Sequence, residues 1–201
     1  MPGTIDNDLD GTDFTIGYDT ATNTAVDSID KIRDTALSHN RIFFIECMGR
    51  HAGDIAIRSG IAGGAVSVLV PEEDYDVDEL VKKLTDSSEN RQKSSLVVVA
   101  EGGQPGRSFK LASKVEKKLQ KYECKVIVLG HIQRGGSPSV SDRVLASRMG
   151  VYAIEGLLDD KKDMMVGVVN RKVKFTSFDD IMSYEHKYSP ELIRVAKILS
   201  I

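Results

Sequence analysis

The chain has 201 residues and carries 27 Lys and Arg against 30 Asp and Glu, for a formal net charge of −3. This length suits one large or two small domains, and the near-neutral charge argues against nucleic-acid binding. No apolar run approaches the roughly 18 residues of a membrane span, and the N-terminus does not resemble a signal peptide. Cys47 and Cys124 lie in apolar runs and are expected to be reduced, packed thiols of a cytoplasmic protein.

Short apolar runs alternate with longer helical patterns along the chain. The runs are rich in Val and Ile without polar alternation, which is typical of strands buried on both faces of a parallel sheet. They cover residues 41–48, 66–70, 96–100, 125–129 and 165–169, and helical periodicity covers 20–40, 77–83, 108–122 and 138–158. This order predicts an α/β fold of doubly wound, mostly parallel sheets with helices on both faces.

Polar residues dominate the start of the chain, where no strand precedes them. Asp6 and Asp8 stand two residues apart with the hydroxyl of Thr4 nearby. One carboxylate could accept a proton from a substrate hydroxyl while the other orients a cation or the first carboxylate. An Asx-rich turn explains the same residues without any chemistry. Because such a loop normally follows a strand, we expect the site to be completed elsewhere or an N-terminal part to be missing.

Three of the predicted strands are followed by residues that suit ligand binding. Residues 48–50 (Met-Gly-Arg) would open a helix and form an anion site, although a tight turn with a solvated arginine fits equally. Glu101 could accept hydrogen bonds from sugar hydroxyls or serve as a cap, and His131 with Arg134 could hold a phosphate. Strand ends of a parallel sheet meet at one edge, so the set indicates a phosphorylated, hydroxylated small molecule.

Four motifs taken together identify a family resemblance. PGTIDND, MGRHAG, EGG after its strand, and LGHIQRGGSPS followed by DR resemble the bacterial ATP-dependent 6-phosphofructokinases over essentially the whole chain. The resemblance implies a glycolytic kinase that transfers the γ-phosphoryl group of ATP to the 1-hydroxyl of fructose 6-phosphate with Mg²⁺. It also implies a cytoplasmic homotetramer that binds neither nucleic acid nor membrane. The alternatives are a pyrophosphate-dependent relative and a non-catalytic sugar-phosphate-binding fragment.

The resemblance also assigns roles at the phosphoryl-transfer centre. Asp6 matches the general base, Thr4 lies near the transferred phosphoryl group, and Asp8 lies near the metal-bound phosphates. The resemblance assigns no metal ligand in this chain and places Asp8 only near the Mg²⁺. Arg50 matches the residue that steadies charge on the transferring group. Gly3 occupies a nucleotide-site position where pyrophosphate-dependent relatives typically carry a lysine, which favours ATP as the donor.

The same resemblance assigns the sugar-phosphate site and the subunit boundary. Met48 and Gly49 line the sugar, Glu101 holds its hydroxyls, and His131 and Arg134 hold the 6-phosphate. Arg41 matches an arginine that reaches into the neighbouring subunit's sugar-phosphate site. Lys125 stands where many relatives have a second such arginine, and it keeps the charge without the bidentate geometry. The remaining matches are effector-site positions: Arg33, Gly64 and Lys93.

Two departures from the family pattern affect these expectations. Val66 and Gln92 stand near positions that carry charged effector-site residues in several relatives, so the resemblance does not extend to classical ADP activation or phosphoenolpyruvate inhibition. The family's glycine-rich nucleotide loop and Gly-Asp-Gly-Ser metal segment have no counterpart here. We therefore expect the C-terminal part of a longer two-domain enzyme, inactive by itself, whose segments at 138–158 and 164–178 expose apolar faces.

The expected domain division follows from the same resemblance. Residues 1–16 and 134–187 would be the remnant of an ATP-binding domain. Residues 17–133 and 188–201 would form the fructose 6-phosphate-binding domain, whose βαβ units are nearly complete.

Overall fold

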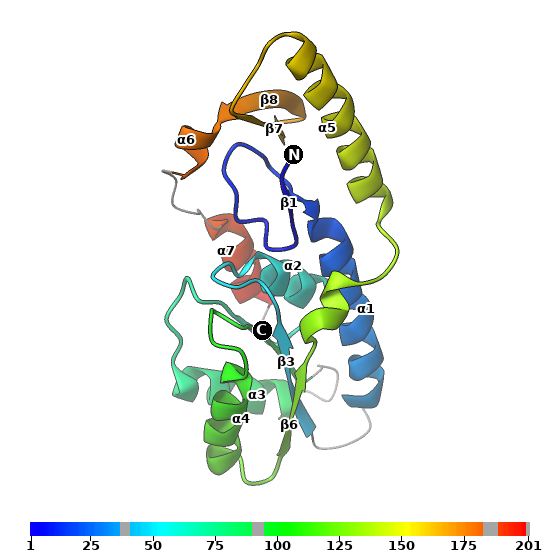
Figure 1. Cartoon of the computed structure of the whole chain (residues 1–201). Helices are drawn as coiled ribbons and strands as arrows, with labels where there is room; N and C mark the ends of the chain where they lie inside the picture. The colour runs from blue at the N-terminus through cyan, green and yellow to red at the C-terminus, as the bar shows by residue number, and fades with distance from the viewer. Residues whose placement is uncertain (37–40, 90–94, 183–188, 200–201) are drawn as a thin grey trace.

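A computed structural model describes residues 1–36, 41–89, 95–182 and 189–199 of the chain. Two lobes are visible, one built around a four-stranded sheet and one around a hairpin and a long helix (Figure 1). The elements in chain order are β1 (Gly3–Thr4), β2 (Ile16–Gly17), α1 (Tyr18–Ala36), β3 (Arg41–Cys47), α2 (Asp54–Ala62), β4 (Ser67–Leu69), α3 (Val77–Glu89), β5 (Leu96–Ala100), α4 (Arg107–Lys118), β6 (Glu123–Val128), the 3₁₀ helix η1 (Gly130–Arg134), α5 (Val140–Leu158), β7 (Met164–Val169), β8 (Lys172–Ser177), α6 (Phe178–Met182) and α7 (Pro190–Leu199).

The larger lobe contains the parallel sheet that the apolar runs predict. Its strand order is β4-β5-β3-β6, and every neighbouring pair is parallel. Alternate residues of one strand enter different cores: Phe44 packs with α3 and α4, whereas Ile45 packs with α1, α2 and α7. Helices therefore cover both faces, which confirms the doubly wound α/β fold and explains why the strands lack polar alternation.

The smaller lobe departs from the prediction of a further parallel strand at 165–169. There β7 pairs with β8 in an antiparallel hairpin, and β8 was not predicted. Asn170 and Arg171 both have positive φ angles (49° and 66°), as in the two-residue turns that join antiparallel strands. β8 was missed because it is polar on alternate positions and only half-buried, while Met149, Val166 and Val168 form the small core beside it.

The predicted helices are present, with their ends shifted. α5 begins at Val140 because Ser139 is its N-cap, whose hydroxyl accepts the N–H of Asp142 at 3.1 Å. α3 continues to Glu89, six residues beyond the predicted end at 83, and α4 ends at Lys118, before the predicted end at 122. The predicted extension of α1 through 37–40 falls outside the described residues.

The smaller lobe exposes apolar side chains, as predicted for both of its segments. On α5 the exposed ones are Val140, Val144, Val151, Tyr152, Ile154, Leu157 and Leu158, and the later segment adds Met164 and Phe178. Leu158 is 80% exposed at the end of the helix.

None of the helices among the described residues is long and apolar enough to cross a membrane.

Candidate functional site

Polar residues from three strand ends and the N-terminal loop converge at one edge of the parallel sheet. Arg50 follows β3, Glu101 follows β5 and Arg134 ends the 3₁₀ helix after β6. The N-terminal segment, blue in Figure 1, lies between the β7–β8 hairpin and this edge. Arg50, Glu101, Arg134 and Asp8 all act electrostatically on the carboxylate of Asp6. The tertiary structure thus brings together five residues that the sequence singled out.

The carboxylate of Asp6 has a pKa raised above its ordinary value. Burial is the largest cause, and the negative charges of Asp8 and Glu101 act in the same direction. Arg134 and Arg50 lower the pKa and partly offset this shift. A carboxylate with raised proton affinity, within the electrostatic reach of two arginines, is suited to accept a proton from a substrate hydroxyl.

The loop that carries Asp6 is built by its neighbours. The hydroxyl of Thr4 accepts the N–H of Asp6 at 3.1 Å. Asn7 adopts a left-handed φ of 55°, which asparagine tolerates better than most residues, and its Oδ1 accepts the N–H of Thr15 at 2.8 Å. The Thr15 hydroxyl in turn donates to the carbonyl of Thr4 at 2.7 Å. Asn7 thus holds the turn of this loop, and it is a structural residue that the sequence reasoning missed.

The turn after β3 is held by Glu101. Its Oε1 accepts the N–H groups of Gly49 at 3.3 Å and Arg50 at 2.9 Å. Gly49 has a φ of 152°, and a Cβ there would lie 2.4 Å from the carbonyl oxygen of Ala52, so the turn requires glycine. The Arg50 side chain is exposed and its φ is 54°. Glu101 therefore fixes the turn that presents Arg50, a role that the sequence did not predict.

The 3₁₀ helix η1 presents His131 and Arg134 with exposed side chains. Between them Gln133 is 1% exposed, and its Oε1 accepts the N–H of Met48 at 2.8 Å. This bond ties the end of β3 to the helix after β6 and so fixes the spacing between Arg50 and Arg134. Gln133 was missed because a single glutamine between Ile132 and Arg134 gives no signal of burial.

Arg41 and Lys125 lie at the opposite end of the sheet from the convergent residues. Both pair with Glu123, at 2.9 Å from Arg41 Nε and 2.5 Å from Lys125 Nζ. Hydrogen bonds from Lys125 and then Arg41 lower the pKa of Glu123. Because β3 spans seven residues, about 20 Å separate Arg41 from the turn at Arg50. Neither cation joins the site of its own chain.

The predicted effector positions also lie apart from the convergent residues. Arg33 Nη1 donates to the carbonyl of Gly63 at 3.1 Å, and a Cβ on the adjacent Gly64 would lie 4.0 Å from the same nitrogen. Arg33 and Gly64 are therefore neighbours. Lys93 and Gln92 fall outside the described residues.

The described residues contain no preformed metal site. No three His, Cys, Asp or Glu side chains within them are grouped to hold a metal ion. Mg²⁺ binds through one or two carboxylates together with phosphate oxygens, so Asp8 fits such an ion only alongside a phosphorylated substrate. Gly3 is exposed, and nothing lies within 4 Å of the position of a Cβ there. A larger side chain would therefore have room at this position.

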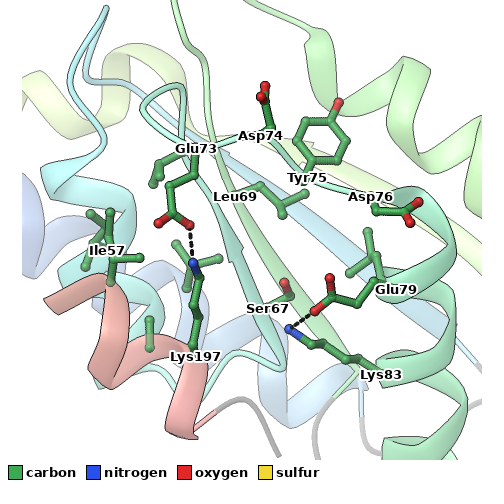
Figure 2. A pocket seen from close by; sticks show the side chains of 15 residues that line it. Ile57, Ser67, Leu69, Glu73, Asp74, Tyr75, Asp76, Glu79, Lys83 and Lys197 are labelled. Carbon is green, nitrogen blue, oxygen red and sulfur yellow. Dashed lines mark ion pairs between the residues drawn. The ribbon is translucent and has the colours of Figure 1, made fainter. Parts of the chain in front are cut away.

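A separate pocket of about 240 Å³ lies between β4, α3 and α7 (Figure 2). Its floor is apolar, and two ion pairs border it: Glu73 with Lys197 at 2.6 Å and Glu79 with Lys83 at 3.1 Å. None of the predicted site residues lines this pocket. The hollow is therefore distinct from the convergent residues around Asp6.

Comparison with known proteins agrees with these features. The family model described as Phosphofructokinase matches residues 1–157. The chain is 53% identical to the ATP-dependent 6-phosphofructokinase of Bacillus velezensis, across 100% of this chain and 62% of that protein. It is 47% identical to the ATP-dependent 6-phosphofructokinase of Cytophaga hutchinsonii, across 99% of this chain and 61% of that protein. The chain thus spans less than two thirds of the curated relatives it matches.

Solved structures show the same fold. Pichia pastoris phosphofructokinase in the T-state matches with a TM-score of 0.84 at 22% identity, over 99% of this chain and 27% of that one. The pyrophosphate-dependent phosphofructokinase of Marinobacter aquaeolei matches with a TM-score of 0.80 at 25% identity, over 94% of this chain and 53% of that one. With a family model matching most of its length and half its residues identical to curated members, the chain belongs to the phosphofructokinase family.

Proposed function

We propose that the chain carries the sugar-phosphate site and general base of an ATP-dependent 6-phosphofructokinase, acting as part of a longer or complemented protein. The observation that supports this proposal most is the convergence of Arg50, Glu101, Arg134 and Asp8 on Asp6. The reaction converts fructose 6-phosphate and ATP into fructose 1,6-bisphosphate and ADP. Phosphoryl transfer needs positioning and charge stabilisation more than covalent chemistry, and a group of this composition supplies both.

In the proposed mechanism Asp6 accepts the proton of the sugar 1-hydroxyl. The oxygen of that hydroxyl bonds to the γ-phosphorus of ATP, and the bond between the γ-phosphorus and the departing ADP oxygen breaks. The raised pKa of Asp6 supports this role because it brings the carboxylate closer to the working pH. Arg50 faces the phosphoryl group and stabilises its developing charge, and Thr4 orients the loop. Mg²⁺ bound with ATP would neutralise phosphate charge, and Asp8 is the carboxylate of this chain that would help to hold it.

The sugar phosphate is held by groups that do not change charge during the reaction. His131 and Arg134 are exposed at the end of β6 and would bind the 6-phosphate. Glu101 uses Oε1 for the turn of Gly49 and Arg50, and we assign its Oε2 to the sugar hydroxyls. Met48 lies beside this turn and would line the sugar.

The domain division and the donor follow from the same proposal. Residues 17–133 with 188–201 would form the sugar-phosphate domain, and residues 1–16 with 134–187 would belong to the ATP domain. This division is supported by the two lobes, with the parallel sheet in one and the hairpin in the other (Figure 1).

Gly3 and the curated relatives named ATP-dependent favour ATP over pyrophosphate. Two free cysteines suit a reducing cytoplasm.

A coupled assay tests the proposed reaction. The 201-residue chain is assayed alone, and together with the N-terminal portion of the Bacillus subtilis relative, with ATP or pyrophosphate as donor. We expect turnover only in the combination and only with ATP, while the chain alone binds fructose 6-phosphate weakly in a calorimetric titration. Turnover with pyrophosphate instead of ATP would show that pyrophosphate is the phosphoryl donor. Sugar-phosphate binding without turnover in a properly assembled combination would leave only a binding role.

Substitutions in the combined enzyme test the assigned roles. Arg134→Ala should raise the KM for fructose 6-phosphate about 10- to 150-fold, because one charge-assisted contact is lost, with a smaller change in kcat. Asp6→Ala should lower kcat about 10²- to 10⁴-fold with a smaller effect on sugar affinity. An unchanged KM in the first variant, or near-normal turnover in the second, would contradict the corresponding assignment.

We also propose that Arg41 and Lys125 serve the site of another subunit, which requires an oligomer; the family resemblance implies a homotetramer. Their position at the far end of β3 and β6 supports this, because neither can reach Asp6 of its own chain. Mixed oligomers of an Arg41→Ala chain and an Asp6→Ala chain should regain activity, since some sites draw intact residues from each. Confirmed mixing without recovered activity would assign Arg41 to its own subunit.

A further inference from the structure

Glu46 is a buried carboxylate next to the proposed site that the mechanism does not use. It lies near the end of β3, one residue before Cys47, and is 1% exposed. A buried carboxylate is costly unless its oxygens are fully hydrogen-bonded. The position of its partners therefore shows what this side chain does.

The partners of the Glu46 side chain all belong to the segment after β5. Oε1 accepts the N–H of Gly106 at 2.6 Å, and Oε2 accepts the N–H of Ser108 at 3.0 Å and the hydroxyl of Ser108 at 2.5 Å. These groups lie at the N-terminus of α4, where backbone N–H groups lack partners within the helix and favour negative charge. Glu46 thus supplies, from a neighbouring strand, the cap that α4 does not find locally.

The same segment begins with Glu101. The N–H of Glu101 donates to the carbonyl of Cys47 at 3.0 Å, and two turn hydrogen bonds, from Gln104 to Glu101 and from Arg107 to Gln104, connect it to α4. Three glycines between Glu101 and α4 have positive φ angles: 58° at Gly102, 70° at Gly103 and 86° at Gly106. Consecutive residues of β3 therefore hold both ends of the loop, the first end by the Cys47 carbonyl and the second by the Glu46 side chain.

Glu46 also connects to the third strand end. Its main-chain carbonyl accepts the N–H of Leu129 at 3.0 Å, directly before the 3₁₀ helix that carries Arg134. One residue of β3 thus contacts the segments that carry Glu101 and Arg134. This connection gives the sugar-phosphate residues a common support.

We propose that Glu46 is a positioning residue for fructose 6-phosphate binding, which it supports by fixing the loop that aims Glu101. The inference rests on the proposed function. When Glu46 holds Gly106 and Ser108, the loop is anchored at both ends, and Glu101 can hold the turn of Arg50 with one oxygen while the other faces the sugar. Without that anchor, the loop with its three flexible glycines is held only at the Cys47 end, and the Glu101 side chain is less firmly aimed.

The variant Glu46→Gln tests this role with minimal change of shape. A glutamine has one acceptor oxygen, so its amide N–H₂ would face an N–H donor of Gly106 or Ser108. In the combined enzyme we expect the KM for fructose 6-phosphate to rise about tenfold or more, with the KM for ATP unchanged. Ser108→Ala removes only the hydroxyl bond and should give a smaller rise of the same kind.

A matched control separates positioning from stability. Val115 is fully buried on the same helix α4, so Val115→Ala should destabilise the fold without touching the cap. Loss of stability lowers the amount of active enzyme but leaves the KM of the folded fraction unchanged. A rise in KM in Val115→Ala equal to that in Glu46→Gln would overturn the proposal, as would unchanged KM values in both Glu46→Gln and Ser108→Ala.

A double-mutant cycle tests whether Glu46 acts through Glu101. If it does, Glu46→Gln should raise the KM little further in a Glu101→Gln background. Fully additive effects would show that Glu46 does not act through Glu101. These outcomes are distinct from failure of the proposed function, which would appear as a parent enzyme that does not phosphorylate fructose 6-phosphate at all.

Discussion

Asp142 provides a direct test of how the two lobes are joined. It lies in the first turn of α5 and is 3% exposed. Its Oδ1 accepts the N–H of Gly17 at 2.8 Å, and its Oδ2 accepts the N–H of Thr20 at 2.8 Å together with the Thr20 hydroxyl. The N–H of Ser139 donates back to the Thr20 hydroxyl at 3.0 Å. Asp142 of α5 therefore caps the start of α1, and Thr20 of α1 holds Ser139, the N-cap of α5.

Asp142→Asn should destabilise the chain by about 1.3–4 kcal/mol. The amide group would face the donor N–H of Gly17 or Thr20, and a buried N–H left without an acceptor costs about 1–3 kcal/mol. Loss of the negative charge at the N-terminus of α1 adds about 0.3–1 kcal/mol. Neither cost appears for a carboxylate in solvent, so Asp160→Asn is the matched control, at an exposed position whose φ of 56° asparagine tolerates.

Urea unfolding of both variants, followed by circular dichroism and extrapolated to water, measures the free-energy difference. We expect Asp160→Asn to change the free energy of unfolding by less than about 0.5 kcal/mol. A similarly small change for Asp142→Asn would refute the reasoning, because it would show that the interlocked caps are replaced by water at no cost.

Three further outcomes are expected. Because the pKa of Asp6 is raised in the folded chain, its charge opposes folding above that pKa, and this cost disappears as the pH falls through it. Asp6→Asn should therefore raise the melting temperature at neutral pH but not in acid, and an equal rise at both would contradict this sign. Gly49→Ala should lower stability by about 1–3 kcal/mol in urea unfolding, because a Cβ would approach the Ala52 carbonyl to 2.4 Å. Burial raises the pKa of Cys47 to about 12, so a thiol reagent at neutral pH should modify this residue only after unfolding, and rapid labelling of the folded chain would disprove it.

Local sequence determined the central sheet and the identity of the residues at its edge. The Val- and Ile-rich runs at 41–48 and 96–100 predicted β3 and β5 within one residue, because burial on both faces removes polar alternation. Arg50, Glu101 and Arg134 could be expected to meet because parallel strands end at one edge, and the structure places them there. The family resemblance came from contiguous motifs, which a single sequence displays directly.

Tertiary structure alone decided how those residues are held. Glu46 accepts hydrogen bonds from Gly106 and Ser108, which are 60 and 62 positions further along the chain. The bond between Gln133 and Met48 spans 85 positions, and the bond between Asp142 and Thr20 spans 122. Periodicity and propensity describe only neighbours along the chain, so they cannot show which distant N–H group a buried side chain satisfies. The antiparallel β8 was likewise missed because its half-buried, polar pattern becomes a strand only when β7 pairs with it. The sequence therefore determines which side chains can do the chemistry, and the fold determines their geometry, because only folding brings each buried polar group to its partner.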